Sequence, residues 1–93
     1  MTLQQLHYFR VLAKVQHYTK AAEILLIAQP SLSYAISQLE KELNTQLFER
    51  NGRTVKLSFA GERFLEYVEK ALNALDEGTM MLKTLADPSK SEV

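Results

Sequence analysis

Residues 29–43 carry hydrogen-bonding side chains at helical spacing. At about 100° per residue they form a helix with two different faces. The outward face holds small hydroxyls, an aromatic ring, an amide and a lysine: Ser33, Tyr34, Ser37, Gln38 and Lys41. No acid precedes Glu40, so the first part of this face suits a surface that exchanges hydrogen bonds with base edges in a DNA groove. The alternative interpretation is an ordinary amphipathic helix with a solvated polar face.

The opposite face of this segment is apolar and needs other elements to pack against. It presents a stripe at intervals of three and four residues: Leu32, Ile36, Leu39 and Leu43. Pro30 suits the first helical position, where no backbone N–H is needed. The spacing therefore predicts a helix over about residues 30–43.

Two helices are predicted before this one. Thr2 and Gln5 have the spacing of a capping box, and a core stripe follows them: Leu3, Leu6, Phe9, Leu12 and Ala13. Thr19 is the predicted N-cap of a short helix over residues 20–26, and residues 27–29 form a tight turn. A short helix, a three-residue turn and a longer helix make a helix-turn-helix, whose second helix enters the major groove.

A hairpin, or wing, is predicted after this motif. Residues 47–50 and 54–57 are short extended runs, and residues 51–53 can turn with positive φ. Arg50, Arg53 and Lys56 place three positive charges at and beside the tip. Beside a helix-turn-helix, such charges favour contact with phosphates or the minor groove. The alternative is a solvated hairpin whose arginines contact nothing specific.

A long helix is predicted to close the chain, capped by Ser58 and ending at about residue 85. Its apolar residues alternate in steps of three and four, as in a helix that pairs with another helix: Leu65, Val68, Leu72, Leu75, Thr79, Leu82 and Ala86. A body this small cannot cover the whole seam, so a dimer is expected. The chain thus divides into a winged helix-turn-helix domain (1–57), a linker or dimerisation helix (58–86) and a linker or disordered tail (87–93).

Composition limits the class of protein. The 93 residues suit one small domain, and the absence of cysteine excludes disulfides and thiolate metal sites. Nothing in the first residues indicates secretion, and no segment approaches the length of a membrane span, so a cytoplasmic protein is expected. Residues 1–57 carry seven Lys/Arg and four Asp/Glu, whereas residues 58–93 carry four Lys/Arg and seven Asp/Glu. A basic first half suits a domain that binds a polyanion.

The order of helix, helix-turn-helix, wing and seam helix resembles the N-terminal region of LysR-type transcriptional regulators. The resemblance covers about residues 2–86 and rests on motifs of matching type and spacing: the alanine pair at 21–22, QPSLS at 29–33, QLE at 38–40, LFER at 47–50, and Leu43, Arg53, Leu57 and Gly61. It implies a mainly α fold, a winged helix-turn-helix with a two-strand wing and a long C-terminal dimerisation helix. It also implies bacterial, nucleoid-associated regulation of transcription.

The resemblance assigns roles to particular residues. Base-edge contacts fall to Gln29, Ser33 and Tyr34, backbone contacts to Pro30, Ser31 and Ser37, and wing contacts to Arg50 and Arg53, with Gln38 on the same outward face. Two departures change the expected chemistry. Many members have a basic residue where this chain has Tyr34, which can instead meet a thymine methyl or a phosphate. Ala28 replaces a frequent serine and removes one cap for the helix.

The expected partners follow from the same resemblance. They are double-stranded DNA with an interrupted dyad operator and a second copy of the chain, with a tetramer as a further state of a full-length form. A small-molecule effector would bind only through a domain that this chain lacks, so the chain is expected to be a DNA-binding fragment or a naturally short protein. No cofactor, metal or membrane is expected.

Two other functions, an enzyme and a pure interaction module, fit the sequence less well than DNA binding does. An enzyme needs converging titratable groups, but His7 and His17 have no carboxylate at metal-ligand spacing, and the serines have no nearby base. Surface roles are therefore expected for both histidines. A pure interaction module would use the seam helix alone, and the face of residues 29–38 together with the arginine-bearing wing argues against it.

Overall fold

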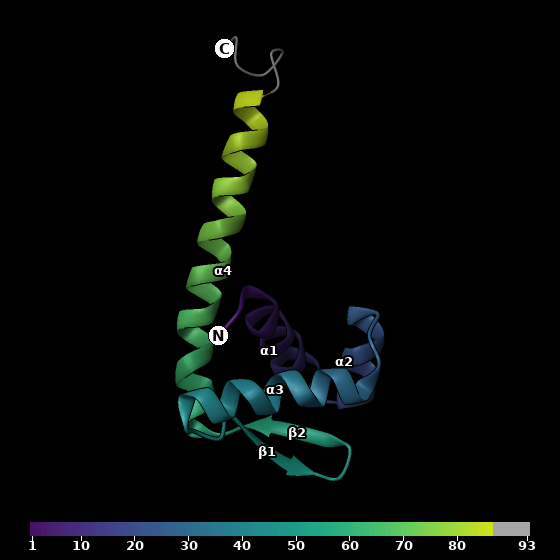
Figure 1. Ribbon diagram of the computed structural model, residues 1–93. Coiled ribbons are helices and arrows are strands. Elements are labelled where there is room, and N and C mark those ends of the chain that lie inside the picture. The colour runs from purple at the N-terminus through teal and green to yellow at the C-terminus, as the bar shows by residue number, and fades with distance from the viewer. Residues whose placement is uncertain (87–93) are drawn as a thin grey trace.

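The computed structural model describes residues 1–86, which form four helices and one antiparallel hairpin (Figure 1). The elements follow in the order α1 (Leu3–Val15), α2 (Tyr18–Leu25), α3 (Gln29–Leu43), β1 (Phe48–Asn51), β2 (Thr54–Leu57) and α4 (Phe59–Ala86). The predicted fold class, a mainly α winged helix-turn-helix followed by a long helix, is confirmed. The tail predicted over residues 87–93 lies outside the described residues.

Helix α1 lies at the centre of the body and contacts α2, α3 and α4. Its start is the predicted capping box: Thr2 Oγ1 accepts from the Gln5 backbone N–H at 3.0 Å, and the Gln5 side chain accepts from the Thr2 N–H at 3.1 Å. Phe9 and Leu12 on the inner face are fully buried. The Phe9 ring meets the rings of Phe48 and Phe64 at centroid distances of 5.4 and 5.5 Å. One aromatic cluster thus ties α1 to the hairpin and to α4.

Helix α2 begins two residues earlier than predicted. Its N-cap is His17, whose Nδ1 accepts from the Lys20 backbone N–H at 3.2 Å, and Thr19 lies inside the first turn. The prediction that Thr19 caps the helix is wrong because an imidazole nitrogen supplies the acceptor that a hydroxyl usually supplies.

The turn between α2 and α3 contains a leucine in a costly conformation. Leu26 ends α2 with φ 60° and ψ 42°, and its side chain is 91% exposed. Left-handed backbone costs an ordinary L-residue about 1–2 kcal/mol, whereas asparagine adopts it readily. We therefore expect Leu26→Asn to raise the free energy of unfolding by about 1 kcal/mol, measured by denaturant titration at one fixed protein concentration.

Leu26→Ala is the control for this prediction, because alanine keeps the Cβ that causes the strain but removes the exposed apolar surface. Its stability should match that of the wild type. A loss of stability in both variants would mean that the Leu26 side chain is covered by another molecule in solution.

The hairpin has the predicted strands, with β1 starting at Phe48 and paired from Phe48↔Leu57 to Asn51↔Thr54. Gly52 alone supplies the positive φ of the turn, at 66°. A third segment, not predicted, runs beside β2: His17 and Thr54 form a bridge, the Val55 N–H donates to the Gln16 carbonyl at 3.1 Å, and the Tyr18 N–H donates to the Arg53 carbonyl at 3.3 Å. The link between α1 and α2 therefore fixes the position of the wing.

Helix α4 is capped by Ser58, as predicted, since its Oγ accepts from the Gly61 N–H at 2.9 Å. Gly61 is buried against the chain before the hairpin, and a Cβ there would lie 2.1 Å from the Leu47 carbonyl oxygen. Only glycine fits this approach without movement of the backbone. The start of α4 is thus locked to the start of the wing.

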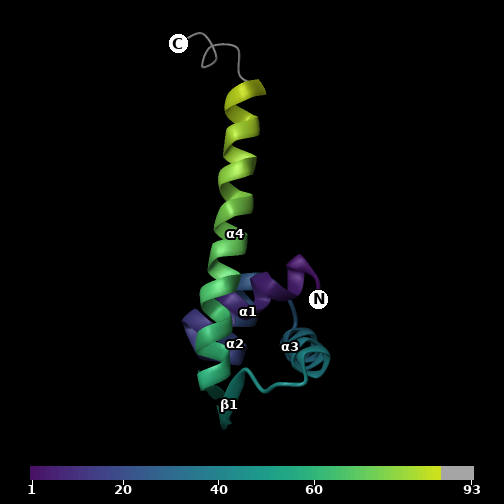
Figure 2. The same ribbon diagram turned by 90° about the vertical axis from the view of Figure 1, so that its left-hand side faces the viewer.

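The far half of α4 projects from the body, which gives the described residues a long dimension of 54 Å (Figure 2). The five apolar residues predicted to meet a second chain fall into two groups. Val68 and Leu72 are 2% and 1% exposed and belong to the domain's own core, with Leu65 packed beside them. Leu75 and Leu82 are 50% and 63% exposed. This corrects the prediction for Val68 and Leu72, because α4 uses its first half to cover the body and leaves only its second half for a partner.

Candidate nucleic-acid interface

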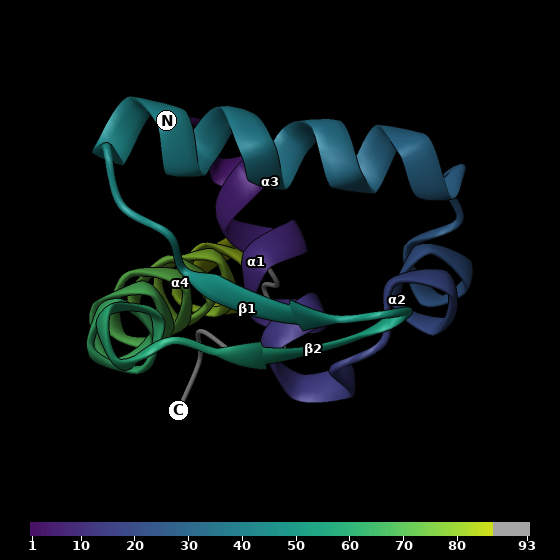
Figure 3. The same ribbon diagram turned by 90° about the horizontal axis from the view of Figure 1, so that it is seen from below.

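A groove of about 760 Å³ separates α3 from the hairpin. Seen from below, α3 and β1 run beside each other, and the hairpin tip lies close to α2 (Figure 3). The groove is lined by polar side chains from α3 and by residues of the wing and α2: Gln29, Pro30, Ser33, Tyr34, Ser37, Glu40, Gln46, Phe48, Arg50 and Tyr18. Five of the predicted α3 contacts and one wing arginine therefore meet in a single site.

The entry of α3 lacks a side-chain cap. Ala28 occupies the N-cap position and makes no side-chain cap bond, and Pro30 lies within the first turn. Gln29 is the first helical residue, one position earlier than predicted for the start of the helix. Ala28 thus leaves the Gln29 N–H without a capping side chain, whereas Pro30 has no N–H and the Ser31 N–H donates to the Ala28 carbonyl at 3.0 Å.

Four side chains form a continuous chain of contacts across the groove. The Gln29 Nε2 donates to Ser33 Oγ at 2.7 Å, and the Arg50 Nη2 donates to the same Oγ at 3.4 Å. The Arg50 guanidinium carbon lies 4.4 Å from the centre of the Tyr18 ring, within the range of a cation–π contact. Helix α2, helix α3 and strand β1 each contribute to this network.

Strand geometry explains the direction of Arg50. Residues two apart in a strand share a face, so Arg50 lies on the same side as Phe48, which is buried. Its partner across the hairpin is Val55, also buried. The Arg50 guanidinium therefore lies over Tyr18 on the α3 side of the hairpin, where it stays exposed, and not among the contacts of the wing tip that the sequence predicts for it.

Glu40 fixes the far end of the groove. Its Oε2 accepts from the Leu47 N–H at 2.7 Å and from the Phe48 N–H at 3.2 Å. The carboxylate lies on the groove side of α3. These two bonds tie the segment before β1 to α3, so the width of the groove is set by a side chain and not by a loop alone.

The remaining predicted contacts lie elsewhere. At about 100° per residue, Ser31 and Gln38 fall on the other flank of α3, outside this groove. Arg53 lines an adjoining hollow of about 470 Å³ together with Thr19, Gly52 and three residues of the main groove. The structure thus separates the predicted set into a groove cluster, a wing-tip arginine and two residues on the far flank.

Tyr18 and Thr19 are site residues that the sequence analysis missed. Tyr18 belongs to none of the motifs in the sequence, yet its buried ring, 7% exposed, forms the floor beneath Arg50. No local signal links residue 18 to residue 50, since their contact depends on the bridge between the α1–α2 link and β2.

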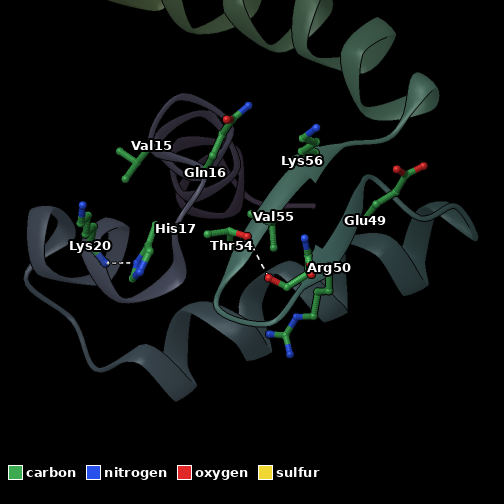
Figure 4. Close-up of a pocket in the computed structure, with 10 residues that line it drawn as sticks. Val15, Gln16, His17, Lys20, Glu49, Arg50, Thr54, Val55 and Lys56 are labelled. Atoms are coloured by element: carbon green, nitrogen blue, oxygen red, sulfur yellow. Dashed lines mark hydrogen bonds between the residues drawn. The ribbon is translucent and has the colours of Figure 1, made fainter.

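A separate pocket of about 510 Å³ lies behind the hairpin (Figure 4). His17 and Lys20 line one wall, and Lys56 stands on the other side of the hairpin from Arg50 (Figure 4). His17 is engaged as the cap of α2. His7 is exposed, with its Nδ1 3.3 Å from Arg10 Nη2. Both histidines therefore have structural or surface positions.

Residues 1–86 have the features of neither a metal centre nor a membrane-spanning helix. In that part of the chain, no three His, Cys, Asp or Glu side chains gather as a metal site would require. None of its helices combines the length and the hydropathy needed to span a bilayer.

Comparison with known proteins identifies the family. Residues 3–62 match the family described as bacterial regulatory helix-turn-helix protein, lysR family. The chain belongs to the lysR family. HTH-type transcriptional regulator BenM of Acinetobacter baylyi is 43% identical over 91 residues, which are 98% of this chain and 30% of BenM. The uncharacterized HTH-type transcriptional regulator YybE of Bacillus subtilis is 41% identical over 93 residues, the whole of this chain and 32% of YybE. This lysR-family chain thus spans about a third of the length of these curated relatives.

Solved structures agree with this assignment. A BenM_DBD/catB site 1 DNA complex superposes with a TM-score of 0.86 at 44% identity, covering 92% of each chain. A CbnR_DBD–DNA complex superposes with a TM-score of 0.85 at 30% identity, covering 94% of this chain and 100% of that one. The lysR-family chain therefore has the fold of domains that were crystallised with DNA.

Proposed function

We propose that this chain binds double-stranded DNA sequence-specifically and serves as the DNA-binding part of a transcriptional regulator. The observation that carries the proposal is the groove between α3 and the wing, where Gln29, Ser33, Tyr34 and Arg50 converge. Amides, hydroxyls and a guanidinium are the groups that read base edges in the major groove. BenM_DBD and CbnR_DBD, which share this fold, were crystallised in complexes with DNA.

In this proposal α3 enters the major groove and the wing lies on the backbone or in the minor groove. Gln29 and Tyr34 face bases from α3, while Pro30, Ser31 and Ser37 lie near the sugar-phosphate backbone. Arg53, at the wing tip, is the candidate for a phosphate or minor-groove contact. Residues 1–57 are the unit that recognises DNA, and residues 58–86 form the helix that carries it.

We propose that α4 pairs with α4 of a second copy through its projecting half. Leu75, Leu82 and Leu85 are exposed there by 50%, 63% and 65%. A monomeric protein rarely exposes an apolar stripe of this length without a partner. A homodimer would present two α3 helices to two half-sites of an interrupted dyad.

The proposal is a binding function in the bacterial cytoplasm, at the nucleoid, and not an enzymatic one. Among the described residues, the polar side chains of the groove are amides, hydroxyls and an arginine, and Glu40 is engaged by two backbone amides. This set lacks a nucleophile paired with a base. A pure interaction module would not use the groove between α3 and the wing. A measurement of DNA binding therefore distinguishes a DNA-binding domain from such a module.

Selection of bound duplexes from random-sequence DNA tests the proposed function. The dissociation constant should then be measured on a selected duplex and on a scrambled duplex at several salt concentrations. We expect binding to the selected duplex about 10³-fold tighter or better, and affinity on both duplexes should fall as salt rises. Equal binding to the two duplexes at every salt concentration would refute sequence-specific recognition.

Arg53→Ala tests the wing tip. If Arg53 meets a phosphate, affinity should fall about 3- to 10-fold on every duplex, and the salt slope should become shallower by about 0.9. If Arg53 enters a narrow minor groove, the loss should be larger on sites flanked by A·T runs than by G·C runs. Lys83→Ala, which removes one charge from the far part of α4, is the control and should change neither quantity. Unchanged affinity in Arg53→Ala would show that the wing tip does not contact DNA.

A further inference from the structure

We propose that Tyr18 is a positioning residue for specificity: its ring holds the Arg50 guanidinium against Ser33, so that Arg50 helps to discriminate between DNA sequences. This inference rests on the proposed function and adds a residue of α2 and a wing arginine on the α3 side of the hairpin to the recognition surface. The observation behind it is that three elements meet at one guanidinium.

If no other side chain held the Arg50 guanidinium, Arg50 would contact DNA without distinguishing one sequence from another. A long, exposed side chain at a wing can reach any nearby phosphate, and a phosphate contact carries no sequence information. Arg50 is instead held from two directions. Tyr18 lies under its face at 4.4 Å, and Ser33 Oγ accepts from its edge at 3.4 Å.

These two contacts fix the plane of the guanidinium. A planar group with five N–H donors can lie flat on a ring and donate from its edge at the same time. The donors left over then point from a fixed position beside Gln29, in the groove that α3 and the wing share. Fixed donors can match the acceptors of one base pair and not those of another.

The tyrosine itself is firmly placed. It is 7% exposed, its N–H donates to the Arg53 carbonyl, and the preceding His17 is bridged to Thr54 of the wing. These hydrogen bonds between the wing strands and the start of α2 hold Tyr18 in place beside the strand that carries Arg50. A change at Tyr18 should reach α3 through Arg50 and Ser33.

The discrimination ratio tests this inference: the dissociation constant on a scrambled duplex divided by that on a selected duplex. Tyr18→Leu should lower the ratio about two- to fivefold, as expected for loss of a cation–π contact. Its salt slope on scrambled DNA should stay unchanged, because Arg50 keeps its charge. Tyr18→Phe, which keeps the ring, should have the wild-type ratio.

Arg50→Lys tests the same inference at an exposed position, so the test remains possible even if Tyr18→Leu does not fold. Lysine keeps the charge but cannot stack and donate from its edge together, so the ratio should fall as in Tyr18→Leu with an unchanged salt slope. The double variant should fall no further than either single one, since the two residues act through one contact.

Three results would overturn the inference. These are a wild-type ratio in both Tyr18→Leu and Arg50→Lys, a fall in Tyr18→Phe equal to that in Tyr18→Leu, or fully additive losses in the double variant. A fall in Tyr18→Phe would mean that the hydroxyl touches DNA directly. A wild-type protein that binds the selected and scrambled duplexes equally would refute the proposed function itself. A wild-type protein that prefers the selected duplex, with no change in Tyr18→Leu and Arg50→Lys, would refute only the role of Tyr18.

Discussion

We expect the double variant Leu75→Glu/Leu82→Glu to be monomeric and to bind its selected duplex about 10²-fold or more weakly than the wild type. Both leucines are exposed by half or more on the projecting part of α4. Two carboxylates on each side of an apolar helix pair would be buried without partners, which the interface cannot tolerate. A dimer carries two α3 helices, so once the first is bound the second binds the neighbouring half-site within the same complex. A monomer carries one α3, and each half-site must then bind a separate molecule from solution. Sedimentation and DNA titration measure the two effects.

Asn73→Glu/Thr84→Glu is the matched control for this prediction. It adds the same charge to the same helix but on the face opposite the apolar stripe, where both side chains are exposed. Its dimerisation and affinity should remain close to those of the wild type. A wild-type chain that sediments as a monomer and still binds the selected duplex tightly would contradict pairing through α4.

The second large effect is expected at Gln29. Gln29→Ala should cost about 1–3 kcal/mol on the selected duplex, which is about a 5- to 150-fold loss of affinity. The amide lies at the entry of α3, where it can offer a donor and an acceptor together to adenine. The loss on scrambled DNA should be small, because a neutral side chain releases no counterions.

Gln38→Ala is the control, because it removes the same amide from the other flank of α3. It should have little effect on either duplex. Equal losses for Gln29→Ala on the selected and scrambled duplexes would show that Gln29 does not read sequence and only supports the turn before Pro30. Loss of specificity in Gln38→Ala would mean that the far flank of α3 faces the bases.

Local patterns in the sequence predicted most of the fold. The Thr2–Gln5 capping box, the apolar stripe of α3, the Gly52 turn and the Ser58 cap depend on residues close in sequence, and each is present in the structure. The helix-turn-helix follows from the same kind of spacing. These features could be predicted because their hydrogen bonds and burial are set within one or two turns of chain.

Long-range contacts could not be predicted in this way. The sequence does not show that residues 16–18 pair with β2, that Arg50 lies over Tyr18, or that Gly61 approaches the Leu47 carbonyl. The packing partners of the apolar seam of α4 could not be predicted either. Its periodicity is continuous, but only the structure shows that Val68 and Leu72 are used by the domain's own core and that Leu75 and Leu82 are not.

Replacing single adenines of the selected duplex by 7-deazaadenine tests most directly whether α3 reads bases in the major groove. The replacement removes the N7 acceptor and leaves Watson–Crick pairing intact. At one position in each half-site, the wild type should lose about tenfold or more in affinity, and Gln29→Ala should lose nothing further. If no position weakens the wild type, or if the two proteins lose affinity equally at every position, Gln29 does not contact the major-groove edge of adenine and the central claim is contradicted.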